Sequence, residues 1–281
     1  MEFVTSTQGV RIPKLIYGTA WKEDKTADLV ELAIETGFRG IDTACQPKHY
    51  QEDLVGQGIK RCIDKGFVKR EDLFLQTKFT PLPGQDPQRI PYDPSAPLAK
   101  RVEQSLERSL LNLQTDYLDS WVLHSPMENF EDLLEVWSVF ENAHSKGQVK
   151  QLGISNCYDP GLFRGLVEGC KFPPSVIQNR FYQRSDFDKE IRKTALENQI
   201  WYQSFWTLTA NPHIVQSEVL GEIAQKYERS SVQVLFRLLT QIGMTPLTGT
   251  TNPKHMKEDL EIFEFELSSS EIEAVRNKFG F

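Results

Sequence analysis

The chain has 281 residues, of which 39% are hydrophobic and 25% are charged, and its formal net charge at pH 7 is −7. This composition is typical of a globular enzyme with a sizeable core, and α/β barrels routinely use about 250 residues as one domain. The acidic balance and the lack of a Lys/Arg cluster argue against a nucleic acid as partner. The sequence shows no signal peptide and no run of roughly 18 apolar residues, so we expect no membrane partner.

The spacing of cysteine and histidine residues gives no metal or disulfide framework. The four cysteines are scattered and include no CxxC pair, which is typical of reduced thiols. The five histidines include no HxH or HExxH pair, so a metal-dependent barrel hydrolase has little support and we expect no metal. A soluble, cytoplasmic protein is therefore the expectation, and its oligomeric state stays open.

Short apolar runs alternate with amphipathic segments from one end of the chain to the other. The runs that predict strands cover residues 15–17, 40–41, 73–75, 117–123, 149–154, 176–177, 201–202 and 244–247. Helical stripes follow them, such as Leu133, Trp137 and Phe140 before Gly147. About eight strand–helix units without a linker predict a single domain over residues 1–281, a closed (β/α)8 TIM barrel, and the missing GxGxxG weakens a doubly wound alternative.

Ionisable residues stand where three consecutive predicted strands end. Asp42 ends the second strand, Lys78 the third and His124 the fourth. Each has a structural explanation on its own, as a turn cap, a snorkelling lysine and a satisfied histidine. In a parallel barrel, however, the C-terminal ends of the strands converge on one rim, where function collects. The irregular stretch 81–97 is a loop on that rim and a candidate lid on the substrate side.

Reduction of a carbonyl group gives a chemical reason for this set of residues. Hydride delivery builds negative charge on the carbonyl oxygen, so the site needs a proton donor aimed at that oxygen. A tyrosine hydroxyl, with an ordinary pKa of about 10, becomes a usable acid when a lysine ammonium stabilises its anion. A carboxylate keeps the lysine charged, and a neutral histidine orients the substrate. Tyr50, in the loop after Asp42, is the candidate donor.

Five motifs follow one another in an order that is informative. They are GVRIP at 9–13, YGTAW at 17–21, GFRGIDTA at 37–44, LHSP at 123–126 and GISN at 153–156. With these motifs the sequence resembles the aldo-keto reductase family nearly from end to end. The resemblance implies an N-terminal hairpin before the barrel and an NADPH-dependent oxidoreductase that reduces an aldehyde or ketone to an alcohol. It also implies a catalytic tetrad of Asp42, Tyr50, Lys78 and His124.

The same resemblance implies which residues contact the cofactor and the substrate. Ser155, Asn156 and Gln178 would hydrogen-bond the nicotinamide carboxamide. Further cofactor contacts are expected from Thr19, Asp42, Gln203, Ser204, Phe205, Thr207, Thr250, Thr251, Asn252, His255 and Asp259. The substrate pocket is expected from Trp21, Phe79, Tyr92 and Trp206. These rings favour an apolar or aromatic carbonyl compound.

The tyrosine spacing departs from the family pattern. The family commonly has its tyrosine five positions after the aspartate, whereas Tyr50 comes eight positions after Asp42, and the segment 46–48 looks like an insertion. Alignment from the residues that follow would instead put His49 in the tyrosine position. We prefer Tyr50, because a neutral hydroxyl suits the acid role at pH 7 and it is the only tyrosine in the loop.

Both ends of the expected cofactor site also depart from the family. Gln203 stands where the family has a tyrosine stacked on nicotinamide, so either Phe205 or Trp206 supplies the ring or the loop is remodelled. Gly249 replaces a lysine that clamps the ribose 2′-phosphate, and His255 lies near the position of an arginine. Backbone N–H groups at the helix start after residue 252 favour a phosphate there. We therefore expect NADP, with a weak preference over NAD.

A second hypothesis belongs to a different class of function. A barrel of this family can bind the nicotinamide cofactor and act mainly as a regulatory or interaction subunit, because fold does not dictate function. All four tetrad residues argue against this alternative, and the altered tyrosine spacing keeps it open.

Overall fold

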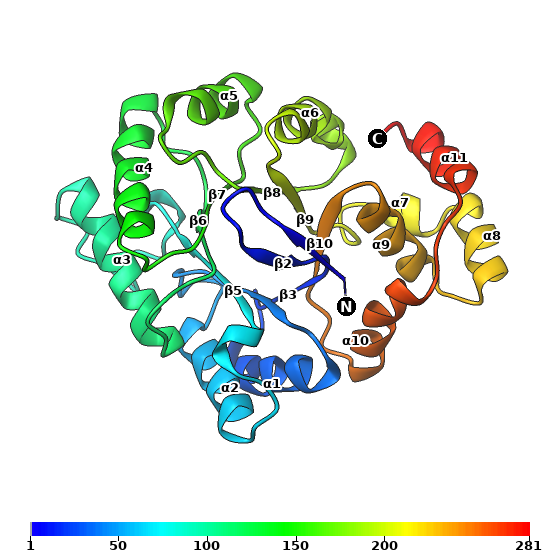
Figure 1. The fold of residues 1–281 in the computed structure, drawn as a ribbon, viewed down its shortest axis with the longest axis horizontal. Coiled ribbons are helices and arrows are strands. Elements are labelled where there is room, and N and C mark those ends of the chain that lie inside the picture. Colours follow the sequence, from blue (N-terminus) through cyan, green and yellow to red (C-terminus); the bar gives the residue numbers. More distant parts are fainter. Residues whose placement is uncertain (1) are drawn as a thin grey trace.

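The computed structural model describes residues 2–281 as a closed barrel of eight parallel strands surrounded by helices (Figure 1). Its strands are β3 (Ile16–Gly18), β4 (Gly40–Asp42), β5 (Phe74–Phe79), β6 (Ser120–Leu123), β7 (Leu152–Ser155), β8 (Val176–Arg180), β9 (Trp201–Phe205) and β10 (Met244–Thr248). They pair in chain order, and β10 pairs with β3 to close the ring. The predicted (β/α)8 fold is confirmed.

A two-stranded hairpin precedes the barrel, as the resemblance implied. Its strands β1 (Phe3–Thr5) and β2 (Arg11–Pro13) are antiparallel and lie across the ring of strands in Figure 1. Ile12 of β2 packs with Ile16, Phe74 and Val176, each of which is the first residue of a barrel strand. The hairpin therefore covers the N-terminal end of the barrel, and the C-terminal ends of the strands remain for a site.

Helices follow the strands around the outside of the ring. They are α1 (Thr26–Thr36), α2 (Glu52–Asp64), α3 (Leu98–Leu113), α4 (Phe130–Ser145), α5 (Pro160–Gly169), α6 (Lys189–Glu197), α7 (Pro212–Val215), α8 (Glu218–Tyr227), α9 (Ser231–Gln241), α10 (Pro253–Leu260) and α11 (Ser269–Phe279). Several begin at side-chain caps, such as Asn129 before α4 and Ser230 before α9. Among residues 2–281, no helix is long and apolar enough to cross a membrane.

The strands differ in length from the apolar runs that predicted them. β5, β8 and β9 extend beyond those runs through polar residues, because polar side chains at the barrel mouth still belong to the hydrogen-bonded ladder. β6 and β7 begin three residues later than predicted. The residues before them form a single bridge between Leu118 and Val149, and the side chain of Asp119 there accepts hydrogen bonds from the N–H of Leu75 and from Lys150.

The alternation of side chains along each strand directs a set of polar residues into the barrel. Gln76 and Lys78 face one side of β5, and Gln178 faces Gln203 of the neighbouring strand inside the ring. In most barrels this interior is filled by branched apolar side chains. In this barrel the interior side chains at this level are polar, which indicates that a functional site begins here.

The loop 81–97 is tied closely to the barrel rim. It contains a short 3-10 helix, Leu82–Gly84, and Gln85 donates a hydrogen bond to the carbonyl oxygen of Thr80 at 3.1 Å. The hydroxyl of Tyr92 donates to the same carbonyl oxygen at 2.8 Å. These two bonds tie the loop to the end of β5 at Gln85 and at Tyr92.

Close packing of α2 on α3 depends on a glycine. A Cβ atom at Gly56 would lie 2.1 Å from the carbonyl oxygen of Asn112, a contact with backbone that cannot move aside easily. We expect Gly56→Ala to lower the free energy of unfolding by about 3 kcal/mol or more, measured by urea denaturation. The matched control is Gly221→Ala in α8, where a Cβ meets nothing within 4 Å. That change should stabilise by about 0.5–1 kcal/mol, and equal effects of the two would contradict the packing argument.

Candidate active site

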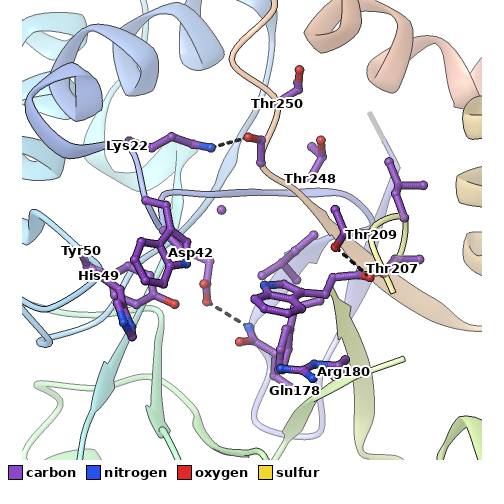
Figure 2. A pocket seen from close by; sticks show the side chains of 18 of the residues that line it. Lys22, Asp42, His49, Tyr50, Gln178, Arg180, Thr207, Thr209, Thr248 and Thr250 are labelled. Carbon is purple, nitrogen blue, oxygen red and sulfur yellow. Dashed lines mark hydrogen bonds between the residues drawn. The ribbon is translucent and has the colours of Figure 1, made fainter. Parts of the chain in front are cut away.

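A cavity of about 1110 Å³ opens at the C-terminal ends of the barrel strands. Its walls come from every side of the rim, and Figure 2 shows Asp42 and Gln178 near its centre with Tyr50 and His49 on one side. This volume exceeds what a small metabolite needs and suits a dinucleotide together with a small substrate. Among residues 2–281, no group of three or more His, Cys, Asp or Glu side chains is arranged to hold a metal ion.

A buried ion pair lies under the cavity. Lys78, on β5, is 1% exposed, and its Nζ donates to Oδ2 of Asp42 at 2.6 Å and to the carbonyl oxygen of Thr43 at 2.8 Å. Burial lowers the pKa of Lys78, and the negative charge of Asp42 opposes that change. Because a buried ammonium is costly without a counter-ion, the carboxylate of Asp42 is what keeps Lys78 charged.

Two glutamines hold the other oxygen of Asp42, and a third glutamine holds both of them. Oδ1 accepts hydrogen bonds from Gln76 at 2.7 Å and from Gln178 at 3.0 Å, and both amides also donate to Gln203. Asp42 therefore has a fixed orientation. The sequence analysis missed Gln76, although its place two residues before Lys78 on the same face of the strand could have indicated it. Gln203 is fully buried in this layer and does not line the cavity.

Tyr50 lies against the ion pair. The Nζ atom of Lys78 is 5.5 Å from the centre of its ring, and the ring of His124 is 6.0 Å away in an edge-on arrangement. Burial, and then the negative charge of Asp42, raise the pKa of the Tyr50 hydroxyl above its usual value. The hydroxyl is therefore fully protonated at neutral pH, as a proton donor must be.

His124 is held as a neutral imidazole. Its Nδ1 atom lies 2.7 Å from the hydroxyl of Thr80. Burial, and then the positive charge of Lys78, lower the pKa of His124 well below its usual value. When the Thr80 hydroxyl donates to Nδ1, the proton is on Nε2, and that N–H is left to meet a ligand in the cavity.

His49 has a different environment from Tyr50. Its ring stacks on Trp21 at 4.0 Å, and the N–H of Trp21 donates to the carbonyl oxygen of His49 at 2.8 Å. The extra residues before it form a turn, in which the N–H groups of His49 and Tyr50 both donate to the carbonyl oxygen of Gln46. The longer spacing thus places His49 at the rim beside an exposed indole and Tyr50 next to Lys78.

A buried carboxylate that the sequence analysis missed ties the Tyr50 loop to the lysine strand. Glu52 accepts hydrogen bonds from the hydroxyl of Thr77 at 2.5 Å and from the amide of Asn112 at 3.0 Å. Burial raises the pKa of Glu52, and these two hydrogen bonds oppose the change. Because Glu52 lies two residues after Tyr50 and Thr77 lies directly before Lys78, the bond fixes the phenol relative to the ammonium.

The residues expected at the nicotinamide end lie together. Ser155 donates to the carbonyl oxygen of Gln178 at 2.7 Å, and Asn156 donates to that of His124 at 2.8 Å. Six of the residues expected at this end line the cavity, namely Asp42, Ser155, Asn156, Gln178, Phe205 and Thr207, and Gln203 does not. Ser204 and Thr19 do not: the hydroxyl of Ser204 accepts from Thr207, and that of Thr19 donates to the carbonyl oxygen of Asp42.

The opposite end of the cavity is formed by β10 and the start of α10. Thr250, His255 and Asp259 line it, together with Gly249, whereas Thr251 and Asn252 do not. The carbonyl oxygen of Gly249 accepts a hydrogen bond from Lys22 (Figure 2). Asp259 accepts from the hydroxyl of Thr248 at 2.7 Å. Burial, together with the charge of Glu258, raises the pKa of Asp259 to about 7 despite that hydrogen bond.

The expected substrate contacts divide into two groups. Trp21 and Trp206 line the cavity and are 60% and 50% exposed. Phe79 and Tyr92 are buried and pack on each other at 5.7 Å, outside the cavity. Phe79 follows the inward-facing Lys78, so the alternation of the strand points it outward toward the helices.

Removal of the Thr77 hydroxyl tests the tie between the loop and β5. We expect Thr77→Val to lower the free energy of unfolding by about 1–3 kcal/mol, because a buried oxygen of Glu52 loses its donor. Urea denaturation measures the change. Thr5→Val, at an exposed position of β1, is the control and should stay within about 0.5 kcal/mol. If Thr77→Val and Thr5→Val had the same free energy of unfolding, the hydrogen bond from Thr77 to Glu52 would not stabilise the loop.

Comparison with known proteins agrees with this architecture. The family model described as "Aldo/keto reductase family" matches residues 14–210. The NADPH-dependent D-xylose reductase of Meyerozyma guilliermondii is 27% identical over 311 residues, covering 97% of this chain and 92% of that protein. Prostaglandin F synthase 1 of Bos taurus is 29% identical over 306 residues, with 97% and 90% covered.

A solved structure shows the same likeness in three dimensions. The crystal structure of an aldo/keto reductase from Brucella melitensis superposes with a TM-score of 0.82 at 25% identity and covers 98% of both chains. The family model alone spans most of the sequence, including the strands that carry Asp42, Lys78 and His124. The chain belongs to the aldo/keto reductase family.

Proposed function

We propose that this protein reduces an aldehyde or ketone to an alcohol with a nicotinamide cofactor and that Tyr50 is the proton donor. The observation that carries the proposal is the phenol of Tyr50 beside the buried pair of Lys78 and Asp42, at the floor of a cavity large enough for both reactants. The curated relatives support the reaction class, since one of them is named an NADPH-dependent D-xylose reductase.

The chain's own residues provide the proton and the charge stabilisation. A bound reduced nicotinamide would supply the hydride. As the carbonyl oxygen gains negative charge, the Tyr50 hydroxyl gives it a proton and becomes a phenolate, which the ammonium of Lys78 stabilises. Asp42 keeps that ammonium charged. Because its pKa is raised, Tyr50 is protonated at neutral pH, which is the state that reduction needs, whereas alcohol oxidation needs the phenolate as base.

His124 orients the substrate in this proposal. Its neutral ring with a free Nε2–H donates a hydrogen bond to the carbonyl oxygen, and Thr80 on Nδ1 holds the ring in place. A charged imidazolium would compete with Tyr50 for the proton transfer. The lowered pKa of His124 prevents that competition at neutral pH.

The residues around the cavity fit a nicotinamide dinucleotide. Ser155, Asn156 and Gln178 offer a hydroxyl and two amides for the carboxamide, and Phe205 or Trp206 offers a ring face. At the other end a Cβ at Gly249 would lie 3.4 Å from the Nζ atom of Lys22 and 3.6 Å from the carbonyl oxygen of Gly18, so the glycine leaves that space to a ligand.

NADP is the proposed cofactor, with NAD as a competent substitute. Thr250, His255 and the amides that begin α10 are the groups proposed to hold a 2′-phosphate. Glu258 and Asp259 also line this end. Their carboxylates weaken the preference for the extra phosphate, since like charges repel and no arginine fork compensates.

Replacing the phenol tests the proton donor. We expect Tyr50→Phe to lower kcat by roughly a hundredfold to ten-thousandfold with an unchanged Kd for NADPH, because the ring stays and the acid is lost. NADPH consumption with a panel of aldehydes and NADPH fluorescence titration give the two quantities. His49→Gln is the matched control and should change kcat by no more than roughly threefold, since His49 stacks on Trp21 at the rim. Turnover that survives Tyr50→Phe and disappears in His49→Gln would reassign the donor.

The titration of Asp259 makes cofactor affinity depend on pH. Asp259 has a pKa of about 7, so it is neutral below that pH and negative above it. We expect the Kd for NADPH to rise roughly fivefold more between pH 6 and 8 in the wild type than in Asp259→Asn, about 1 kcal/mol of repulsion. The 2′-phosphate of NADPH titrates in the same way with both proteins, so the difference between them reports the carboxylate of Asp259 alone. The Kd for NADH should depend on pH equally in the two proteins. If the Kd for NADPH also depended on pH equally in both, the 2′-phosphate would bind away from Asp259.

A further inference from the structure

Arg180 is a cation at the cavity wall that the reaction scheme leaves unused. It ends β8, two residues after Gln178, so both side chains face the same side of the strand, with Arg180 one level nearer the mouth. Figure 2 shows Arg180 beside Gln178, across the cavity from Tyr50 and His49. Because Gln178 bonds Asp42, this end of β8 is anchored to the candidate active site.

The guanidinium of Arg180 has no partner among residues 2–281. It makes no hydrogen bond or ion pair to them, and its Nε is buried away from water without an acceptor. Two other enclosed arginines have ion-pair partners, Arg237 with Glu2 at 3.0 Å and Arg70 with Asp119 at 2.9 Å. Arg101 and Arg192 also have a buried Nε without an acceptor, but neither lines the cavity, so Arg180 is the arginine whose donors a ligand in the cavity can meet. An N–H donor that is shielded from water and has no acceptor costs folding free energy. We therefore expect the acceptor for the Arg180 guanidinium to be an atom of a bound ligand.

Two aromatic rings lie against the guanidinium. It lies 4.2 Å from the ring centre of Trp206 and 5.3 Å from that of Tyr182. The backbone N–H of Arg180 donates to the hydroxyl of Tyr158 at 3.1 Å, which fixes the residue at the end of the strand. Stacking uses the flat faces of the group and leaves the N–H donors in its plane for an oxyanion.

The charges that line the two ends of the cavity differ. Near Arg180 the lining carboxylate is Asp42, which Lys78 already neutralises. The other lining carboxylates, Glu258 and Asp259, belong to α10 at the far end. Lys22 also lines the far end, where its Nζ donates to the carbonyl oxygen of Gly249, but it shares that end with two carboxylates. Near Arg180 the only lining carboxylate among residues 2–281 is already paired, so a carboxylate is attracted more strongly to the end that carries Arg180.

We propose that Arg180 binds a carboxylate carried by the carbonyl substrate, so that the preferred substrates are oxo acids. The proposal rests on the reductase function above and deepens it by naming the substrate class. A planar guanidinium matches a carboxylate through two parallel N–H···O bonds, which lysine cannot reproduce. A cofactor phosphate is the other source of an oxyanion, and we assign the anion to the substrate because Arg180 adjoins the Gln178–Asp42 end of the cavity.

Two aldehydes of matched shape test the assignment: para-carboxybenzaldehyde and para-tolualdehyde. We expect Arg180→Met to lower kcat/KM for para-carboxybenzaldehyde roughly thirtyfold. The value of kcat/KM for para-tolualdehyde, which is neutral, should change no more than about twofold. Arg180→Lys should recover only part of the loss. If both aldehydes lose activity equally, or neither does, the proposal is wrong.

Two binding measurements separate the possible failures. NADPH fluorescence titration of Arg180→Met should give the wild-type Kd; weaker cofactor binding with an unchanged aldehyde ratio would assign the anion to the cofactor and overturn the proposal. Calorimetry with benzoate, and with benzamide as control, needs no turnover. Benzoate should bind the wild type and not Arg180→Met, and if wild type reduced neither aldehyde, benzoate binding would still decide the role of Arg180. Unchanged thermal unfolding shows that each variant is folded.

Discussion

The site depends on keeping one ammonium charged where water is excluded. Lys78 is buried inside the barrel, and it keeps its proton because Asp42 and the carbonyl oxygen of Thr43 accept its hydrogen bonds. A buried carboxylate is itself costly unless its remaining oxygen is satisfied, and the amides of Gln76 and Gln178 do this. The polar layer therefore spans several strands and exists only because the barrel is closed.

Burial also sets the protonation of the groups around this pair. The same exclusion of water raises the pKa of Tyr50 and lowers that of His124, so both groups are neutral and both can donate a hydrogen bond. The tie from Glu52 to Thr77 holds the Tyr50 loop at the distance this arrangement needs. The packing of the loop after β4 against β5 therefore sets both the protonation of these groups and their positions.

The cavity lies above this polar layer, and the charges that line its two ends differ. Toward α10 it is lined by Glu258 and Asp259, which disfavour additional negative charge. Toward β8 it is lined by the stacked cation Arg180. A cavity with unlike ends orients a ligand in one direction, and the half-exposed indole of Trp206 lies against the cation at its β8 end.

The sequence by itself determined the barrel, because alternating strand and helix patterns without a linker allow few other folds, and it put Asp42, Lys78 and His124 at strand ends that must share a rim. It could not determine which side chains at that rim reach the cavity. Gln203 turned into the barrel interior and Phe79 turned outward, since the direction of a side chain depends on strand register. Contacts between distant segments, such as Glu52 with Thr77, were decided by tertiary packing alone, because no local pattern encodes which helix meets which strand.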